Sequence, residues 1–282
     1  MPELPDLLHI QRYLRNNVSG RTITGVDVKQ PVVLRVASEQ SFHAMLSGKT
    51  IGAVEHHGPF LCLTMNTGVE VVINLMVAGS LQHQREGEKP RGYLCFSLEF
   101  EDHTFLHLCD EKLMAKVYVV PAGDYTLIPK YADQGIDILS GKFTLDRFHA
   151  LVPRGRRRQV RVFLRDHTLL SAIGNAYADE ILFEAGIHPK TFLGKLAPDR
   201  IEALYNAIRS VMRWGIDEVE RARAPIDVKV RGHMKIRNRK GEPCVRCRAT
   251  IRREGVRGYD TYFCPVCQPA TRKHFLDWTT VS

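Results

Sequence analysis

Short apolar runs dominate the first third of the chain, and turn-forming or charged residues separate them. β-branched and aromatic side chains gather at 22–28, 60–65, 69–75, 92–100, 104–109 and 115–120. These residue types favour strands, and short connections such as 66–68 favour antiparallel neighbours. We therefore predict an antiparallel β-sandwich or barrel, with helices near 6–15 and 39–46.

The pattern changes after about Leu139, where apolar residues recur at helical spacing. Four stretches show it, at 143–152, 159–170, 176–186 and 197–215. Thr144 and Asp199 lie where helices are expected to begin, and Gly186 where one is expected to end. The fold class is thus α+β, with a β domain, then a helical domain, then a short tail that bears cysteines.

Charge is distributed unevenly along the 282 residues, whose net charge is +9. Residues 1–150 carry 14 Lys and Arg against 17 Asp and Glu, whereas residues 229–257 alone carry eleven basic and two acidic side chains. Such clustering is the footprint of a protein that binds a phosphate backbone. A solvated basic face, an RNA partner or an acidic protein partner are the alternatives.

Four of the seven cysteines form two Cys-x-x-Cys pairs separated by sixteen residues: Cys244, Cys247, Cys264 and Cys267. This spacing is typical of one tetrahedral zinc ion with four thiolates, which leaves no open position for water. We predict one structural zinc ion; disulfides or a redox pair are the alternative. Cys62, Cys95 and Cys109 occur singly in apolar stretches and are expected in the core.

Three separated stretches together resemble the formamidopyrimidine-DNA glycosylase/endonuclease VIII family of DNA-repair enzymes. They are the opening MPELPD (1–6), the segment AIGNAYADEILFEAGIHP (172–189), and RKGEPC (239–244) leading to CPVCQ (264–268). The resemblance implies a catalytic β-sandwich domain at 1–130, a helix–two-turns–helix DNA-binding domain at 131–236, a zinc finger at 237–270 and a tail at 271–282.

The resemblance implies that Pro2 is the nucleophile once Met1 is removed, and that Glu3 transfers protons. An α-amine has a pKa near 8, so more of it is neutral at neutral pH than of a lysine. Its attack on the sugar would expel a damaged base and form an iminium ion, after which β-elimination can break the strand. The alternative is that Pro2-Glu3 is a plain helix start.

Side chains that would contact DNA follow from the same resemblance. Val77, Lys112 and Met114 would fill the gap left by a flipped nucleotide. Asn175 and Arg161 would hold phosphate, although Asn175 could instead be a buried helix residue. The zinc hairpin has Tyr259 where the family has an arginine, and Arg257 is a possible substitute.

The sequence departs from the family at three further places. Pro59 replaces a lysine that serves phosphate binding and elimination, the 88–93 loop lacks a histidine, and Lys112 and Leu113 replace paired arginines. Replacement of arginine by leucine removes a bidentate charged group. We therefore expect altered lesion choice and weak δ-elimination.

The leading hypothesis is a base-excision DNA glycosylase with AP-lyase activity. The alternatives are a paralogue that binds lesions with little chemistry, and a zinc-ribbon nucleic-acid protein outside repair. We expect damaged DNA as partner, no membrane, no small-molecule cofactor and a monomer. No apolar run approaches the roughly 20 residues of a membrane helix, and the N-terminus is not a secretory signal, so we expect a cytoplasmic protein, nucleoid-associated if bacterial.

Overall fold

The computed structural model describes residues 1–36 and 41–270 and contains two compact units. The first unit comprises Met1–Gln134 and Gly215–Val230, and the second comprises Gly135–Trp214 and the chain from Arg231 onward. The predicted bounds at 130, 236 and 270 stay predictions, and the predicted tail at 271–282 lies outside the described residues.

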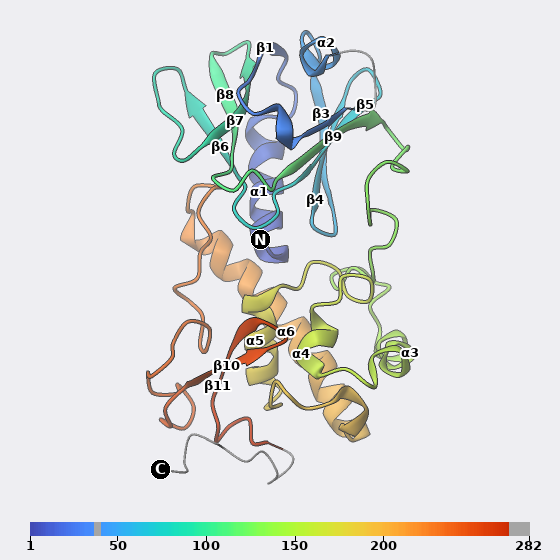
Figure 1. Cartoon of the computed structure of the whole chain (residues 1–282), viewed down its shortest axis with the longest axis vertical. Coiled ribbons are helices and arrows are strands. Elements are labelled where there is room, and N and C mark those ends of the chain that lie inside the picture. The colour runs from blue at the N-terminus through green and yellow to red at the C-terminus, as the bar shows by residue number, and fades with distance from the viewer. Residues whose placement is uncertain (37–40, 271–282) are drawn as a thin grey trace. The chain divides into compact units, whose positions relative to one another are not determined.

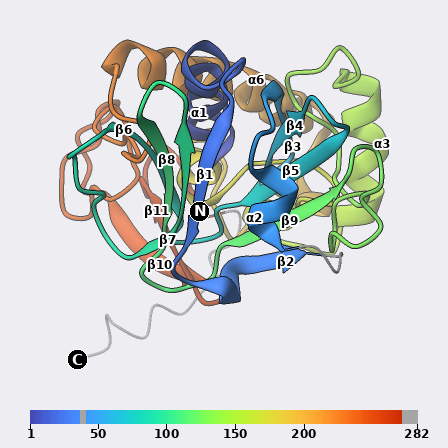
Figure 2. The same cartoon turned by 90° about the horizontal axis from the view of Figure 1, so that it is seen from above.

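The first unit is built on two sheets (Figure 1). The four-stranded sheet has the order β1-β7-β8-β6 and the five-stranded sheet the order β2-β9-β5-β4-β3, which Figure 2 shows on the left and right. All neighbours are antiparallel except β2 and β9. The strands are β1 (Ile23–Val28), β2 (Leu34–Val36), β3 (Ile51–His57), β4 (Phe60–Met65), β5 (Val69–Asn74), β6 (Ser80–Arg85), β7 (Leu94–Phe100), β8 (Thr104–Cys109) and β9 (Lys116–Pro121).

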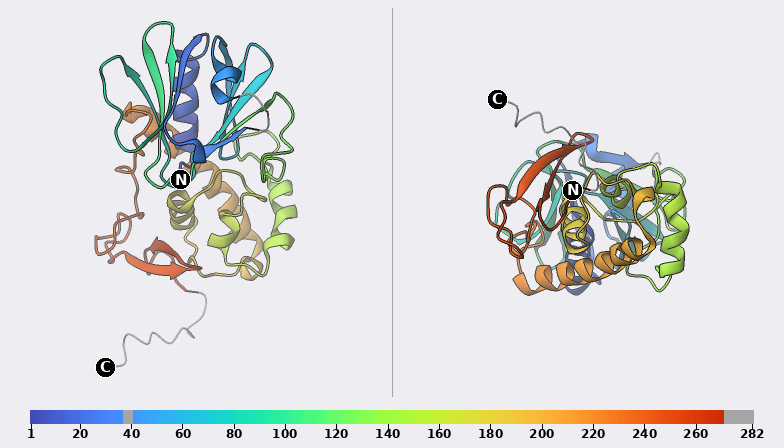
Figure 3. Two further views of the ribbon diagram at one scale, coloured as in Figure 1. Left: turned by 45° about the horizontal axis from the view of Figure 1, so that its top comes forward. Right: turned by 90° about the horizontal axis from the view of Figure 1, so that it is seen from below.

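Helix α1 (Leu4–Asn17) lies between the two sheets (Figure 3, left). Leu7, Ile10 and Leu14 are buried, and their spacing of three and four residues places them on one helix face. The 3-10 turn η1 (Pro31–Val33) and the short helix α2 (Phe42–Leu46) complete this part of the chain.

Residues 215–230 belong to the first unit and are fastened to it by polar contacts. The Nε2 of His9 lies 2.9 Å from the carbonyl of Ala224, and Arg12 forms an ion pair with Glu220. Arg91 binds both carboxylate oxygens of Asp227, at 2.8 and 2.6 Å. This segment brings Lys229 to the N-terminal end of α1, as described below.

The second unit is mainly helical. Its elements are α3 (Leu145–Gly155), α4 (Val160–Leu164), α5 (Asn175–Glu184), the 3-10 turn η2 (Leu193–Lys195) and α6 (Pro198–Ala222), which continues into the first unit after Trp214. Helix α4, two turns and α5 form the predicted helix–two-turns–helix segment. A hairpin of β10 (Arg252–Val256) and β11 (Tyr259–Phe263) follows, and β11 contacts α5.

Most of the predicted elements are confirmed, and the errors have local causes. Strands β2, β3 and β6 were not predicted. Strand β2 has only three residues, β6 reads SLQHQR, with polar residues at most positions, and the pairing of β3 shifts between Ile51 and Val54. The helix predicted over 159–170 ends at Leu164, because Asp166 accepts the N–H of Thr168 in a turn. Residues 39–40 of the predicted second helix lie outside the described residues.

No helix among the described residues is long and apolar enough to cross a membrane.

Candidate functional site

The N-terminal amine lies against a loop of the first unit. The Met1 nitrogen and the Lys229 Nζ both donate to the carbonyl oxygen of Val77, at 3.2 and 3.1 Å. Pro2 and Glu3 are buried where α1 begins, and the Glu3 N–H donates to the Asp6 carboxylate at 2.8 Å. Pro2 and Lys229 line the same pocket.

The surroundings of the amine favour its neutral, nucleophilic form. Burial, followed by the positive charge of Lys229, lowers the pKa of the Met1 amine from 8.0 to about 6, while Glu3 and Asp6 oppose the shift. Burial disfavours the charged state and a nearby cation repels a second one. An amine held here is therefore largely deprotonated at neutral pH.

Two loops pass from one sheet to the other at the same end of the first unit. The 75–79 loop joins β5 to β6, and the 110–115 loop joins β8 to β9. Since β5 pairs with β9 at Asn74 and β6 pairs with β8 at Ser80, the loops are neighbours. A Cβ built on Gly79 would lie 2.4 Å from the Leu75 carbonyl oxygen and 3.2 Å from the Ala115 Cβ, so a larger residue would clash there.

Buried or partly buried polar side chains fix the shape of both loops. Asp110, 1% exposed, accepts the backbone N–H groups of Lys112, Met114 and Ala115 at 2.9, 2.8 and 2.7 Å. The Asn74 Oδ1 accepts the N–H of Met76 at 3.0 Å. These Asx-type bonds stabilise tight turns.

The loop tips present apolar side chains to the surface. Val77 is 47% exposed and Met114 is 39% exposed, and Lys112 is exposed beside them. The backbone φ angles of Met76 and Leu113 are 49° and 51°, in the left-handed region that residues with a Cβ adopt at a cost. Exposed apolar tips on strained, braced turns are typical of functional loops.

The departures from the family pattern in this unit occupy defined places. Pro59 lies in the β3–β4 turn, directly after Gly58, whose φ is 53°. The 86–93 loop is tied down by Arg91, whose backbone exchanges two hydrogen bonds with the Gln82 side chain and whose guanidinium binds Asp227.

In the second unit, Arg161 is completely buried rather than exposed. Its Nε donates to Asp179 at 2.8 Å, and its Nη2 donates to the Asn175 Oδ1 at 3.0 Å and to the Asp260 carbonyl at 2.7 Å. Both members of the Arg161–Asp179 pair are 0% exposed. From its buried position, Arg161 therefore orients the side chain of Asn175 in the first turn of α5.

Asp179 also holds the zinc hairpin. It accepts the Thr261 hydroxyl at 2.7 Å and the Tyr262 N–H at 3.3 Å, and it forms an ion pair with Arg237 at 2.7 Å. One carboxylate on α5 thus joins α4, the segment before the hairpin, and the hairpin itself. Charge-assisted hydrogen bonds of this kind are shorter and stronger than neutral ones.

Neighbouring contacts extend this attachment. Glu180 accepts the N–H groups of Lys235, Ile236 and Arg237 at 3.1, 2.9 and 2.9 Å, and burial raises its pKa. The Gln268 Nε2 donates to the Ile187 carbonyl, while its Oε1 accepts the Cys264 N–H. These contacts attach the segment before the hairpin to α5, and the Cys264–Cys267 pair to Ile187, just after α5.

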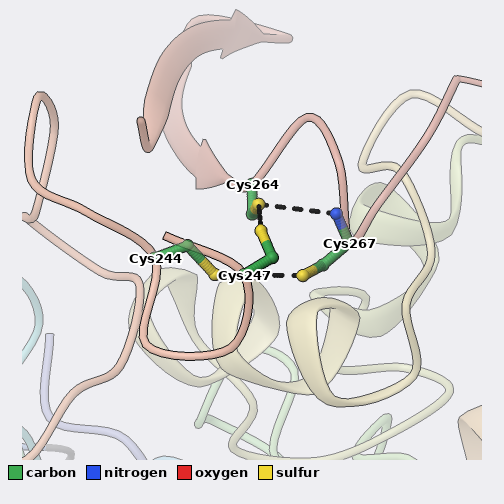
Figure 4. A group of neighbouring side chains, drawn as sticks. All are labelled: Cys244, Cys247, Cys264 and Cys267. Carbon is green, nitrogen blue, oxygen red and sulfur yellow. Dashed lines mark hydrogen bonds between the residues drawn. The ribbon is translucent and has the colours of Figure 1, made fainter. Parts of the chain in front are cut away.

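The four predicted cysteines converge (Figure 4). Their sulfur atoms all lie within 4.8 Å of one another, with Cys244 Sγ 3.9 Å from Cys267 Sγ and Cys247 Sγ 3.4 Å from Cys264 Sγ. A tetrahedral zinc ion with Zn–S bonds of about 2.3 Å requires sulfurs about 3.8 Å apart. Backbone N–H groups of Arg246 and Cys267 point at the sulfurs of Cys244 and Cys264. The cluster fits one structural zinc ion.

The hairpin tip carries the remaining predicted residues. Arg257, with φ 51°, lies in the β10–β11 turn and is exposed, and Tyr259 is 50% exposed. The Tyr259 ring lies 4.0 Å from the guanidinium carbon of Arg165, the residue that caps α4.

The predicted site residues therefore form two sets, one in each unit. Pro2, Glu3, Val77, Lys112 and Met114 lie in the first unit. The second contains Arg161, Asn175, Arg257, Tyr259 and the four cysteines. Whether they act as predicted stays a prediction.

Several residues that shape the site were not predicted from the sequence. Asn74 ends β5 and Asp110 directly follows β8, positions where Asn and Asp often bond back to the backbone, and this signal could have found them. Asp179 and Lys229 carry no local signal, because their partners lie 18 and 152 residues away along the chain.

Comparison with known proteins covers both units. Family models described as "Formamidopyrimidine-DNA glycosylase N-terminal domain", "Formamidopyrimidine-DNA glycosylase H2TH domain" and "Zinc finger found in FPG and IleRS" match residues 1–117, 134–223 and 241–270. Formamidopyrimidine-DNA glycosylases from Bacillus cereus and Chloroflexus aggregans are 31% and 32% identical, each covering 95% of this chain, and 99% and 98% of their own lengths.

Solved structures agree with the fold. The MutM (FPG) protein from Thermus thermophilus matches with a TM-score of 0.82 at 29% identity, over 95% of this chain and 98% of its own. A Lactococcus lactis FPG variant in complex with DNA containing Fapy-dG matches with a TM-score of 0.85 at 24% identity, over 95% of this chain and 100% of its own.

A β-sandwich whose N-terminal amine meets the braced 75–79 loop, followed by a helix–two-turns–helix segment bound to a zinc hairpin, defines the class of zinc-containing DNA-repair glycosylases. Within that class, the matches over nearly the whole chain are specific. The chain belongs to the formamidopyrimidine-DNA glycosylase family.

Replacement of Asp179 by Asn should strongly destabilise the protein. It would leave the buried Arg161 charge without its counter-ion, which costs about 3–5 kcal/mol in comparable pairs. The free energy of unfolding, measured by urea denaturation of the zinc-loaded chain, should fall by that amount. The matched control is Arg253→Ala, which removes the exposed Arg253–Asp260 pair of the hairpin and should cost at most about 1 kcal/mol. Equal decreases in the free energy of unfolding of the two variants would contradict the stabilising role assigned to Asp179.

The purified chain should contain one zinc ion, released when a mercurial reagent titrates the thiolates. Because zinc binding contributes to folding in such small modules, Cys247→Ser should lower both zinc content and thermal stability. Metal analysis and a thermal melt test this expectation. Cys95→Ser, which changes a buried cysteine outside the cluster, should keep its zinc. Unchanged melting after metal loss would show that the ion is not structural.

Proposed function

We propose that this protein is a base-excision-repair DNA glycosylase with AP-lyase activity, which acts through a Schiff base on Pro2 after Met1 is removed. The observation that carries the proposal is the placement of the N-terminal segment. It meets the 75–79 loop at Val77, its amine has a lowered pKa, and Pro2 and Glu3 are buried together at the start of α1.

The chemistry requires a neutral amine and a proton donor side by side. The Pro2 nitrogen attacks C1′ of the damaged nucleotide, the C1′–N bond to the base breaks, and the base leaves with a proton. The Pro2 nitrogen then loses its proton, and its lone pair breaks the C1′–O4′ bond while O4′ takes up a proton, so that the sugar ring opens and an iminium ion forms at C1′. The iminium ion acidifies the C2′ hydrogen; its removal expels the 3′ phosphate by β-elimination, and water then releases the amine. Glu3 supplies and removes protons at the sugar.

The two loops would support a flipped nucleotide. Val77 and Met114 offer exposed apolar surface and Lys112 offers charge, which suits insertion into the gap in the base stack. In the second unit, Asn175 and the hairpin residues Arg257 and Tyr259 would contact the backbone. The burial of Arg161 supports a role in positioning Asn175 rather than direct binding of phosphate.

Pro59 supports the expectation of weak δ-elimination. A proline in the β3–β4 turn offers neither a charge for the phosphate nor a proton for elimination. With Leu113 in place of an arginine, fewer cationic groups are available to bind the lesion, so we also propose altered lesion choice. DNA with an abasic site should yield mainly the β-elimination product.

Borohydride reduction in the presence of abasic-site DNA should trap a covalent adduct on Pro2. The chain is first checked by mass spectrometry for loss of Met1, and the adduct is mapped by peptide sequencing. A chain with an N-terminal extension has no free Pro2 amine and should give no adduct. Glu3→Gln keeps the amine and should slow excision of the damaged base by roughly 10²–10⁴-fold, the usual contribution of proton transfer.

Two outcomes would contradict this proposal. An equal yield from the extended chain would place the nucleophile elsewhere, on a lysine. No adduct with any lesion in a panel, despite tight binding, would favour the lesion-binding paralogue.

Lys229→Met should shift the pH profile of adduct formation upward. The positive charge of Lys229 lowers the pKa of the Met1 amine, and Pro2 lines the same pocket as Lys229. We therefore expect removal of this charge to raise the pKa of the Pro2 amine that is exposed when Met1 is removed. The amine is reactive above its pKa; the trapping rate should therefore fall near pH 6 and stay unchanged near pH 9. Lys89→Met removes an exposed lysine of the same unit and should leave the profile in place. A profile that is unaltered in Lys229→Met would refute the electrostatic role of Lys229.

A further inference from the structure

A groove on the second unit combines apolar side chains with two arginines, and no acidic residue lines it. This α6 groove lies between the 138–145 segment and one face of α6, and its volume is about 410 Å³. We propose that it binds an acidic peptide segment of a partner protein, whose carboxylates meet Arg209 and Arg213 while one large apolar side chain enters the groove. The inference goes beyond the proposed function, because neither Pro2 nor Asn175 lines the groove.

One face of α6 forms the first wall of the groove. Tyr205, Arg209 and Arg213 follow one another at spacings of four residues, and Met212 lies three residues after Arg209, so all four are on the same side of the helix. Tyr205 and Met212 are buried, whereas both arginines are exposed. This wall is therefore apolar at its base and cationic along its rim.

The 138–145 segment forms the opposite wall, and hydrogen bonds fix its shape. The Asp137 Oδ1 accepts the N–H of Leu139 at 2.9 Å, in a turn that leaves Leu139 41% exposed. The carbonyl of the buried Phe143 accepts the Tyr205 hydroxyl at 3.0 Å, which attaches the segment to α6. Because these contacts are already made, a ligand would not have to order the groove in order to bind.

Arg209 and Arg213 carry positive charges that no acidic side chain neutralises. Neither forms an ion pair with any residue in the described ranges 1–36 and 41–270. The Arg209 Nη1 donates to the Tyr205 hydroxyl at 3.3 Å, and its guanidinium carbon lies 5.6 Å from the centre of that ring, so this side chain is held at the groove. Like charges four residues apart on a helix repel one another. Carboxylates of a ligand would offset this repulsion, so charge complementarity specifies an acidic partner.

The composition of the groove also specifies the rest of the ligand. Its volume lies in the range of binding sites, and its apolar base suits a side chain such as that of Phe or Leu. The phosphate backbone of duplex DNA would contact the rim but leave the apolar base unfilled. Residues 271–282 of the chain itself carry Arg272 and Lys273 against Asp277 alone, a charge that does not complement the rim.

The test is fluorescence anisotropy with the full chain and a labelled peptide of Asp and Glu residues around a single Phe. The parent chain should bind this peptide saturably, and a peptide with Ala in place of Phe should bind roughly tenfold more weakly or worse, because less apolar surface is buried. The groove variant, Arg209→Glu with Arg213→Glu, turns two attractions into repulsions and should weaken binding by roughly tenfold or more.

A matched variant separates the groove from the net charge of the chain. Arg154→Glu with Arg157→Glu makes the same change in charge at two exposed arginines of the second unit that do not line the groove. Because charges at the surface are screened by salt, this control should change the peptide affinity by less than about twofold. Leu139→Asp places a carboxylate on the wall of the groove and should weaken peptide binding. Melting temperatures establish that every variant is folded.

Several results would overturn the proposal. One is that no acidic peptide with a Phe, Leu or Trp residue binds saturably, and another is that the control variant loses as much affinity as the groove variant. Self-association of the parent chain in sedimentation velocity, lost in the groove variant, would assign the groove to a second copy of the chain. Peptide binding that occurs only in a chain ending at residue 270 would assign it to residues 271–282. A smaller salt dependence of DNA binding in the groove variant, with no peptide binding by the parent chain, would assign the two arginines to DNA.

Discussion

The second unit depends on one buried carboxylate. Asp179 receives Arg161 from α4, Arg237 from the segment before the hairpin, and Thr261 from the hairpin, and it is itself 0% exposed. A buried charge is costly unless it is paired and hydrogen-bonded on every side. Displacement of a helix or of the hairpin would remove a partner from the buried charge and destabilise the fold. The helices and the hairpin are therefore held in one arrangement. The orientation of Asn175 follows from it.

In the first unit, side chains hydrogen-bond to backbone N–H groups of the loops. The loops that end β5 and β8 take tight, partly left-handed turns, and Asn74 and Asp110 satisfy the backbone groups that these turns leave over. The shape of the two loops therefore does not depend on the side chains at their tips.

Periodicity and spacing predicted much of this protein. Local sequence alone was enough to predict the cluster of four cysteines, the helix start at Thr144 and most of the strands. β6 was missed because its stability comes from pairing with β8 and not from its own composition. Arg161 illustrates a second limit: it was expected to hold phosphate, and the sequence did not predict its burial against Asp179 on α5. Tyr259 and Arg165 lie 94 residues apart in the sequence, and neither residue type predicts their contact.

The four-cysteine cluster makes the arrangement of the second unit depend on bound zinc, although the proposed reaction at Pro2 does not use a metal ion. The metal orders the hairpin, and the hairpin provides Thr261 to Asp179 and the Asp260 carbonyl to Arg161. Metal occupancy, burial of the ion pair and orientation of Asn175 are thus thermodynamically linked, and a ligand that favours one favours the others. Under the proposed function, free zinc concentration would therefore be linked to DNA affinity, and because Cys247 is exposed, thiol oxidants would act on the same equilibrium.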